Sequence, residues 1–180
     1  MRFNSILISG TFLLIIFFTG CKKDHFISAN QQMLFQYDYK NDAWGIQHNG
    51  FLIDNKGNIL AYHNPENWNH HDNSYTLTKR QVTENFQKCE LSAEKIPSEE
   101  LHKYSNYIRK IALSKISARR NVAKDAWTAE FICFQYSEST DTYEGHLIKM
   151  EGDFTCENLN FYSKKVAAWM RDIEYKINRK

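Results

Sequence analysis

Hydrophobic and polar residues alternate along two stretches of the chain, and this period of two predicts β-strands. In the first stretch, residues 44–53 and 59–62 are rich in aromatic and β-branched side chains and are separated by the sequence Asp-Asn-Lys-Gly-Asn. Asp, Asn and Gly between two such runs predict a hairpin, with Gly57 supplying the positive φ of the turn. Asn49-Gly50 is itself a turn dipeptide, so it indicates either a second, tighter hairpin or a bulge.

In the second stretch, residues 127–136 and 143–150 have strand composition, and a polar turn at residues 137–142 separates them. The positions from Phe131 to Phe134 are apolar on both sides of the expected strand. Such a strand is usually covered on both faces. We therefore predict a second hairpin whose first strand is central in the sheet.

Helical spacing begins at Thr78. Thr78 and Gln81 have the spacing of a capping box, in which each side chain satisfies a free backbone N–H of the other residue. Val82, Phe86 and Cys89 follow at i, i+4 and i+7 and form one apolar face. This pattern predicts a helix that starts at Thr78.

Two further helices complete the expected fold. Ser98 precedes two glutamates and is the expected N-cap of a helix whose apolar stripe runs from Leu101 to Lys115. The last helix is expected from about Phe161 to Ile177, with Lys164, Lys165, Arg171 and Glu174 on the side that faces water. The order ββ-αα-ββ-α, with hairpins in place of parallel crossovers, predicts an α+β domain: a mainly antiparallel sheet of two hairpins packed with three helices.

A polar segment, residues 22–42, precedes this domain. We interpret it as a tether with a short helix near Asn30 to Tyr37, and we expect a single folded domain at 43–180. The basic segment 115–124 allows two interpretations. It is either a site for anions or membrane headgroups, or, as we prefer, a helix C-terminus followed by a solvated loop.

The first twenty-one residues carry the clearest functional signal. Arg2 is the only charge before an apolar run from Ile6 to Phe18. That run is shorter than the roughly 20 residues that a membrane-spanning helix needs. A basic start, an apolar run and small residues before a cleavage point are typical of a secretory signal peptide.

The sequence Phe18-Thr19-Gly20-Cys21 resembles the lipobox of bacterial lipoproteins, with Phe18 in place of the usual leucine. The resemblance implies that residues 1–20 are removed by cleavage between Gly20 and Cys21, and that the Cys21 thiol carries a diacylglycerol. The protein would then be exported and anchored by lipid to a bacterial inner or outer membrane, with residues 21–42 as anchor and tether. A plain signal peptide or an N-terminal membrane anchor is the alternative.

The stretch from Asp125 to Trp169 is similar to a family of small bacterial lipoproteins of uncharacterised activity. The similar features are a strand, an Asp-Thr-Tyr turn into a second strand, the sequence Glu-Gly-Asp, and a helix that contains Ala-Trp. This resemblance implies a fold and implies no mechanism.

Charge and cysteine content limit the possible partners. Removal of residues 1–20 lowers the formal net charge from +2 to +1, and near-neutrality argues against nucleic acid as a partner. Three cysteines follow Cys21, so at least one of them has no intramolecular partner. Because Cys133 lies in an apolar strand pattern, the possible disulfide is Cys89–Cys156.

No catalytic motif, cofactor motif or zinc-ligand spacing is found in the sequence. His70, His71 and Asp72 lie in a polar loop beside Trp68. With His63 or His48 these histidines could bind a metal, but their spacing matches no known site, and we interpret the loop as solvated.

We therefore expect a membrane-anchored envelope lipoprotein that acts as a binding or interaction module for a protein partner. It would be an accessory subunit or an immunity-type protein. The alternative is a small envelope hydrolase that acts on cell-wall or glycan material, with His63, His70 and His71 as the residues to test.

Overall fold

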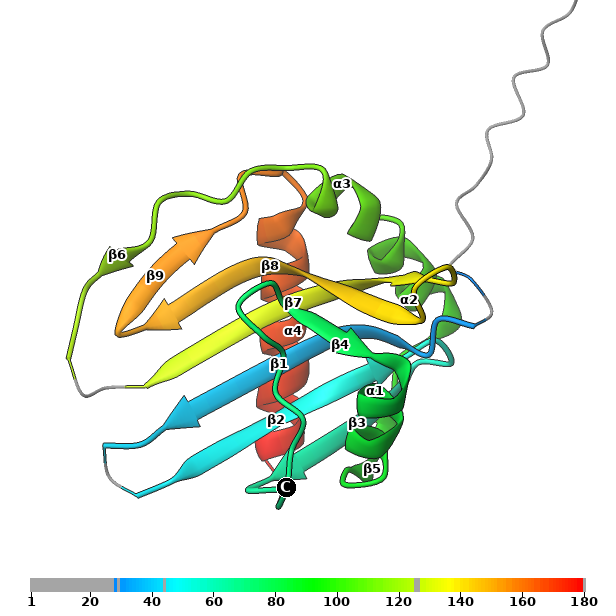
Figure 1. The fold of residues 1–180 in the computed structure, drawn as a ribbon, viewed down its shortest axis with the longest axis horizontal. Coiled ribbons are helices and arrows are strands. Elements are labelled where there is room, and N and C mark those ends of the chain that lie inside the picture. The colour runs from blue at the N-terminus through cyan, green and yellow to red at the C-terminus, as the bar shows by residue number, and fades with distance from the viewer. Residues whose placement is uncertain (1–27, 29, 44, 125–126, 180) are drawn as a thin grey trace, which may run out of the picture.

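The computed structural model describes residues 28, 30–43, 45–124 and 127–179. Its centre is a nine-stranded antiparallel sheet with the strand order β5-β3-β2-β1-β7-β8-β9-β6, and β4 pairs with another part of β8 (Figure 1). The strands are β1 (Met33–Asn41), β2 (Gln47–Asp54), β3 (Asn58–His63), β4 (Thr76–Thr78), β5 (Glu90–Lys95), β6 (Arg120–Asn121), β7 (Thr128–Ser137), β8 (Thr142–Gly152) and β9 (Phe154–Glu157). The helices are α1 (Lys79–Phe86), α2 (Ser98–Ser105), α3 (Ile108–Ala112) and α4 (Ser163–Asn178).

The predicted α+β fold of two hairpins is wrong, because the structure is dominated by one large sheet. Both predicted hairpins exist as β2–β3 and β7–β8, and Gly57 has a positive φ of 79°. Strand β1 lies between them and pairs with both β2 and β7, so the hairpins belong to the same sheet. Edge strand β5 has mostly exposed side chains, so its sequence lacks the apolar alternation that predicts a strand.

The predicted helix near Asn30 to Tyr37 is also wrong, and this error accounts for most of the difference. Met33–Asn41 forms β1, the strand that joins the two hairpins. Phe35, Tyr37 and Tyr39 face one side of the sheet, whereas Gln36 and Asp38, which lie between them, are buried on the other side instead of facing water. The folded domain therefore includes part of the segment that the sequence assigns to the tether.

The helix predictions are largely confirmed. The backbone N–H of Gln81 donates to Thr78 Oγ1 at 3.2 Å, and the Thr78 N–H donates to Gln81 Oε1 at 2.8 Å, which completes the capping box before α1. The helix predicted from Ser98 is divided into α2 and α3. The prediction of Ser98 as its N-cap is wrong, because Ser98 is the first helical residue and Pro97 is the N-cap. Tyr107 lies at the division and stacks on Tyr162 at a centroid distance of 4.2 Å.

The sheet has two differently covered faces. Helix α4 crosses one face, with α2 and α3 packed on the same side (Figure 1), and this core contains Phe35, Phe131 and Trp169. The other face is covered by β4, α1 and the loop at residues 64–75, with Tyr62 and Trp68 in its core. No helix in the described part of the chain is long and apolar enough to cross a membrane.

Candidate functional site

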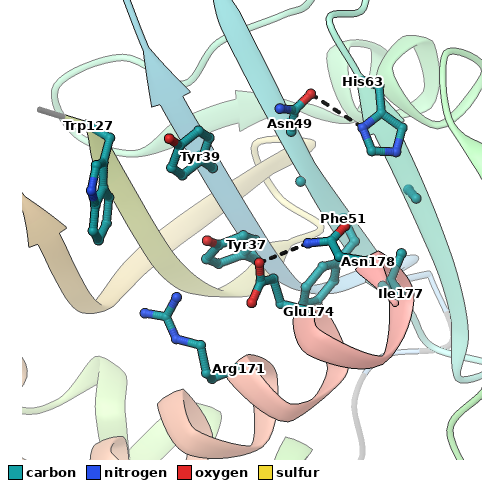
Figure 2. Close-up of a pocket in the computed structure, with 12 residues that line it drawn as sticks. Tyr37, Tyr39, Asn49, Phe51, His63, Trp127, Arg171, Glu174, Ile177 and Asn178 are labelled. Atoms are coloured by element: carbon teal, nitrogen blue, oxygen red, sulfur yellow. Dashed lines mark hydrogen bonds between the residues drawn. The ribbon is translucent and has the colours of Figure 1, made fainter. Parts of the chain in front are cut away.

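An open cleft of about 330 Å³ lies between the C-terminal half of α4 and strands β1–β3 (Figure 2). We call it the aromatic cleft. It is lined by Tyr37, Tyr39, Asn49, Gly50, Phe51, Ala61, His63, Trp127, Arg171, Glu174, Ile177 and Asn178.

Strand alternation places aromatic rings along the sheet side of the cleft. Tyr37 and Tyr39 are two residues apart on β1, so both side chains point toward α4. Tyr37 stacks on Phe51 of the neighbouring strand at 5.5 Å, and Tyr39 stacks on Trp127 at 5.8 Å. Because these rings are held by one another, the cleft offers a preformed aromatic surface.

Helix α4 supplies the charged side of the cleft. Arg171, Glu174 and Asn178 are three and four residues apart, so they lie on one face of the helix. Glu174 accepts a hydrogen bond from Asn178 Nδ2 at 2.9 Å (Figure 2). Arg171 makes an ion pair with Glu151, which offsets its positive charge. Glu151 is shared between Arg171 and Lys149, whereas Glu174 lines the cleft without an ion-pair partner among the described residues.

The pKa of Tyr37 reports this environment. The pKa of Tyr37 is raised to about 12, mainly by burial and also by the negative charges of Glu174 and Glu151, whereas the charge and hydrogen bond of Arg171 act in the opposite direction. Tyr37 is therefore a neutral hydrogen-bonding phenol at physiological pH. An aromatic surface next to a carboxylate favours a bound ammonium or guanidinium group, through cation–π contact and charge-assisted hydrogen bonding.

A buried polar cluster lies on the opposite face of the sheet, centred on Asp38. Asp38 is 2% exposed, and its Oδ1 lies 2.7 Å from His48 Nε2 and 2.5 Å from the Tyr62 hydroxyl. Its Oδ2 lies 2.9 Å from Lys40 Nζ. Burial alone would raise the pKa of Asp38, but the hydrogen bond from His48 and the charge of Lys40 outweigh it and hold the pKa well below its usual range.

A second carboxylate lies beside this cluster, because Glu130 of β7 is directly opposite Asp38 of β1. The Tyr75 hydroxyl donates to Glu130 Oε1 at 2.8 Å. His71 Nε2 lies 3.3 Å from Glu130 Oε2 without an aligned hydrogen bond, and this contact is an ion pair when His71 is protonated. These contacts attach the loop at 64–75 to the sheet.

The pKa of His71 is raised by this position. Burial would lower it, but the contact with Glu130 and a hydrogen bond with the Asp72 carbonyl outweigh burial. The adjacent His70 has a lowered pKa because burial and the positive charge of Lys40 disfavour its charged form. Adjacent histidines of one loop therefore favour different protonation states.

Raising the pH from about 6 to 8 is expected to loosen the loop at 64–75. Protonated His71 stabilises the folded state most at pH values below its ordinary pKa of 6.5, and this contribution is lost as the pH rises through the raised pKa. Backbone amides near His71 should then exchange faster at pH 8, after correction for the intrinsic exchange rate. A His71→Gln variant gains no charge and should lack this pH dependence; an equal response of the two proteins would contradict the prediction.

The histidines chosen for the hydrolase hypothesis do not form one site. His63 lies at the rim of the aromatic cleft, where its Nδ1 is 3.3 Å from Asn49 Oδ1 (Figure 2). His70 lies on the other face, with its ring 5.0 Å from that of His48, and Trp68 packs on Tyr62 at 4.2 Å. Within the described residues, no group of three or more His, Cys, Asp or Glu side chains is arranged to hold a metal ion.

The cysteines after the leader are buried or half-buried thiols. Cys89, Cys133 and Cys156 are all free, and no Cys89–Cys156 bridge is present between these described residues. Burial raises the pKa of Cys89 to about 12 and raises that of Cys133 further. These thiols are therefore protonated at neutral pH and weakly nucleophilic.

Sequence reasoning missed the main residues of both sites. Tyr37, Tyr39 and Asp38 lie in the segment interpreted as a tether, and Glu174 was expected to face water on the last helix. The available signal was the alternation of aromatic and polar residues from Phe35 to Lys40, which has a period of two. Gly20 and Cys21 lie outside the described residues, so the lipid attachment stays a prediction.

Comparison with known proteins gives no match: no family model, no curated protein and no solved structure is significantly similar to this chain.

Proposed function

We propose that this chain is a lipid-anchored binding protein of a bacterial cell envelope. Its aromatic cleft would receive a positively charged side chain, lysine or arginine, of a partner protein. The observation that supports this proposal best is the position of Glu174 beside the ring of Tyr37, in a cleft that Tyr39 and Trp127 also line. Fully desolvated arginine and aromatic contacts are the usual centres of binding energy at protein interfaces.

The polar cluster on the other face supports binding better than hydrolysis. Asp38 is bonded to His48, Lys40 and Tyr62 and is almost fully buried, so it is poorly placed to contact a substrate. The cluster instead ties β1, β2 and β3 together behind the cleft. Since Tyr37 and Tyr39 alternate with Asp38 on β1, a rigid β1 holds the aromatic surface in position.

Glu174→Gln is expected to weaken partner binding at least tenfold, because a charge-assisted hydrogen bond is worth about 1.5–3 kcal/mol. The measurement is a crosslinked pull-down of the lipidated protein from its own membranes, followed by titration of the purified partner. Asp172→Asn is the matched control, because it removes the same charge from an exposed position of α4 outside the cleft. Equal partner affinity of the Glu174→Gln and control variants would contradict the proposed role of the cleft.

Cys21→Ser is expected to abolish lipid attachment and cleavage of the leader. Mass spectrometry of the unsubstituted protein should find a chain that begins at an acylated Cys21, whereas the variant should keep residues 1–20. A chain with an unmodified Cys21 would contradict the anchor, independently of the result for Glu174.

A further inference from the structure

Four large apolar side chains project from one edge of the molecule, near the end of the sheet formed by β9 and β6. They are Leu113, Ile116, Leu159 and Phe161, with exposed fractions of 80%, 46%, 61% and 73%. We call them the apolar tip. A concentration of exposed apolar residues in a folded domain indicates an interaction surface.

Backbone contacts bring the two segments of the apolar tip together. The Leu159 N–H donates to the Lys115 carbonyl at 2.9 Å, and Ile116 forms an antiparallel bridge with Asn158. Asn160 Nδ2 donates to the Lys110 carbonyl at 2.9 Å. Figure 1 shows the same arrangement, with α3 beside the turn that leads from β9 into α4. The apolar tip is therefore one surface built from segments about 45 residues apart in sequence.

Lysines surround the apolar tip. Lys110 Nζ lies 4.4 Å from the centre of the Tyr162 ring, and Lys165 Nζ lies 5.0 Å from that of Phe161. Residues 101–124 contain seven lysines and arginines and no aspartate or glutamate, and residues 158–165 add two lysines without an acid. The carboxylate of Glu157 lies 4.0 Å from Lys164 Nζ. The surface is apolar at its centre and positively charged at its rim.

We infer that the apolar tip is a membrane-contact surface, which inserts its side chains between the anionic headgroups of the bilayer that holds the lipid anchor. This inference rests on the proposed anchoring at Cys21. Exposed leucine, isoleucine and phenylalanine with flanking lysines match the two requirements of an interfacial site, burial of apolar surface and attraction to anionic lipid. The basic segment 115–124 then belongs to a headgroup site, which is the interpretation that the sequence left as the alternative.

Because the proposed lipid anchor already holds the protein at the membrane, the apolar tip needs only a weak affinity for the bilayer. The described chain begins at Ser28, seven residues after Cys21, and Ser28 Oγ donates to Glu138 Oε1 at 2.7 Å. Seven residues span at most about 24 Å, so the domain stays close to the bilayer. Each lysine near an anionic leaflet adds about fivefold to the affinity, and tethering adds a high effective concentration.

The test uses the full lipidated chain in vesicles of phosphatidylcholine, with or without 30% phosphatidylglycerol, made from lipids with brominated acyl chains. Phe161→Trp places a fluorescent reporter in the apolar tip. Leu91→Trp is the matched control, because Leu91 is 69% exposed on β5 at the opposite edge of the sheet. The signal of the four native tryptophans is subtracted with the unsubstituted protein.

We expect the reporter at position 161 to be quenched at least twofold more than the reporter at position 91 in the anionic vesicles. This excess should fall when Lys110→Gln and Lys165→Gln are added, or when phosphatidylglycerol is omitted. Protein that floats with the vesicles but shows equal quenching at the two positions would overturn the membrane contact and leave the anchor intact. Protein that does not float with either vesicle would overturn both.

Discussion

Asp38→Ala is expected to lower the free energy of unfolding by about 3 kcal/mol. Loss of one member of a buried ion pair costs about 3–5 kcal/mol, because the remaining partner is left buried without an opposite charge. The lower end of that range applies here because the side chain of Lys40 is 35% exposed and can be rehydrated, whereas His48 and Tyr62 are buried. Urea unfolding followed by circular dichroism at pH 7 measures the change.

Two comparisons make this prediction specific. Asp42→Ala removes an exposed carboxylate four residues after Asp38, directly past the end of β1. It should change the free energy of unfolding by less than about 0.5 kcal/mol. The lowered pKa of Asp38 means that its contribution is present at pH values above the ordinary aspartate range and is lost as the pH falls below about 4. The difference between the unsubstituted protein and Asp38→Ala should therefore be smaller at pH 3 than at pH 7. A difference that does not depend on pH would rule out this ionic role for Asp38.

Gly50→Ala is expected to lower the free energy of unfolding by about 3 kcal/mol, the upper end of the cost of overpacking. Gly50 lies on β2 opposite Asp38 of β1 and Tyr62 of β3. A Cβ atom at Gly50 would overlap the carbonyl oxygen of Tyr37 and would lie 2.6 Å from Cζ of Tyr62. The Tyr62 ring and the strand backbone would have to move, and the hydrogen bond from Tyr62 to Asp38 would be lost.

Thermal unfolding measures this effect, since 1 kcal/mol shifts the midpoint of a domain of this size by about 2–4 °C. Tyr62→Phe is the comparison, because it removes only the hydroxyl and should cost about 1–2 kcal/mol. If Gly50→Ala lowered the midpoint no more than Tyr62→Phe, the close packing at Gly50 would not be needed for the cluster.

The same residues show why strand β1 was not recognised from the sequence. Gln36, Asp38 and Lys40 alternate with Phe35, Tyr37 and Tyr39, but three polar residues near a charged N-terminal segment are equally typical of a solvated tether. Asp38 can be buried only because His48 and Tyr62 reach it from two other strands. Those partners are 10 and 24 residues away in the sequence. Hydropathy along the chain therefore cannot show that hydrogen bonds offset the cost of burying the Asp38 carboxylate.

The helices were predicted better because their signals are local. The Thr78 and Gln81 capping box involves residues three positions apart, and the apolar stripe of α4 repeats every three or four residues. The turn at Gly57 is likewise determined within a few residues. The sequence could not show that Glu174, on the side of α4 expected to face water, borders an aromatic cleft, because Tyr37, Tyr39 and Phe51 belong to strands more than 100 residues earlier.

The sequence by itself determined two hairpins, the capped helix α1 and helix α4, and it contains the lipobox-like sequence on which the proposed anchor depends. These features rest on interactions between residues close in the chain, where turn chemistry, capping and periodicity act directly. Only the tertiary structure decided that β1 joins the hairpins into one sheet, that His63 and His70 lie on opposite faces, and that Glu174 meets Tyr37. Each of these results depends on pairing between distant strands and on burial of polar groups, whose free energy is set by partners that only the folded chain brings together.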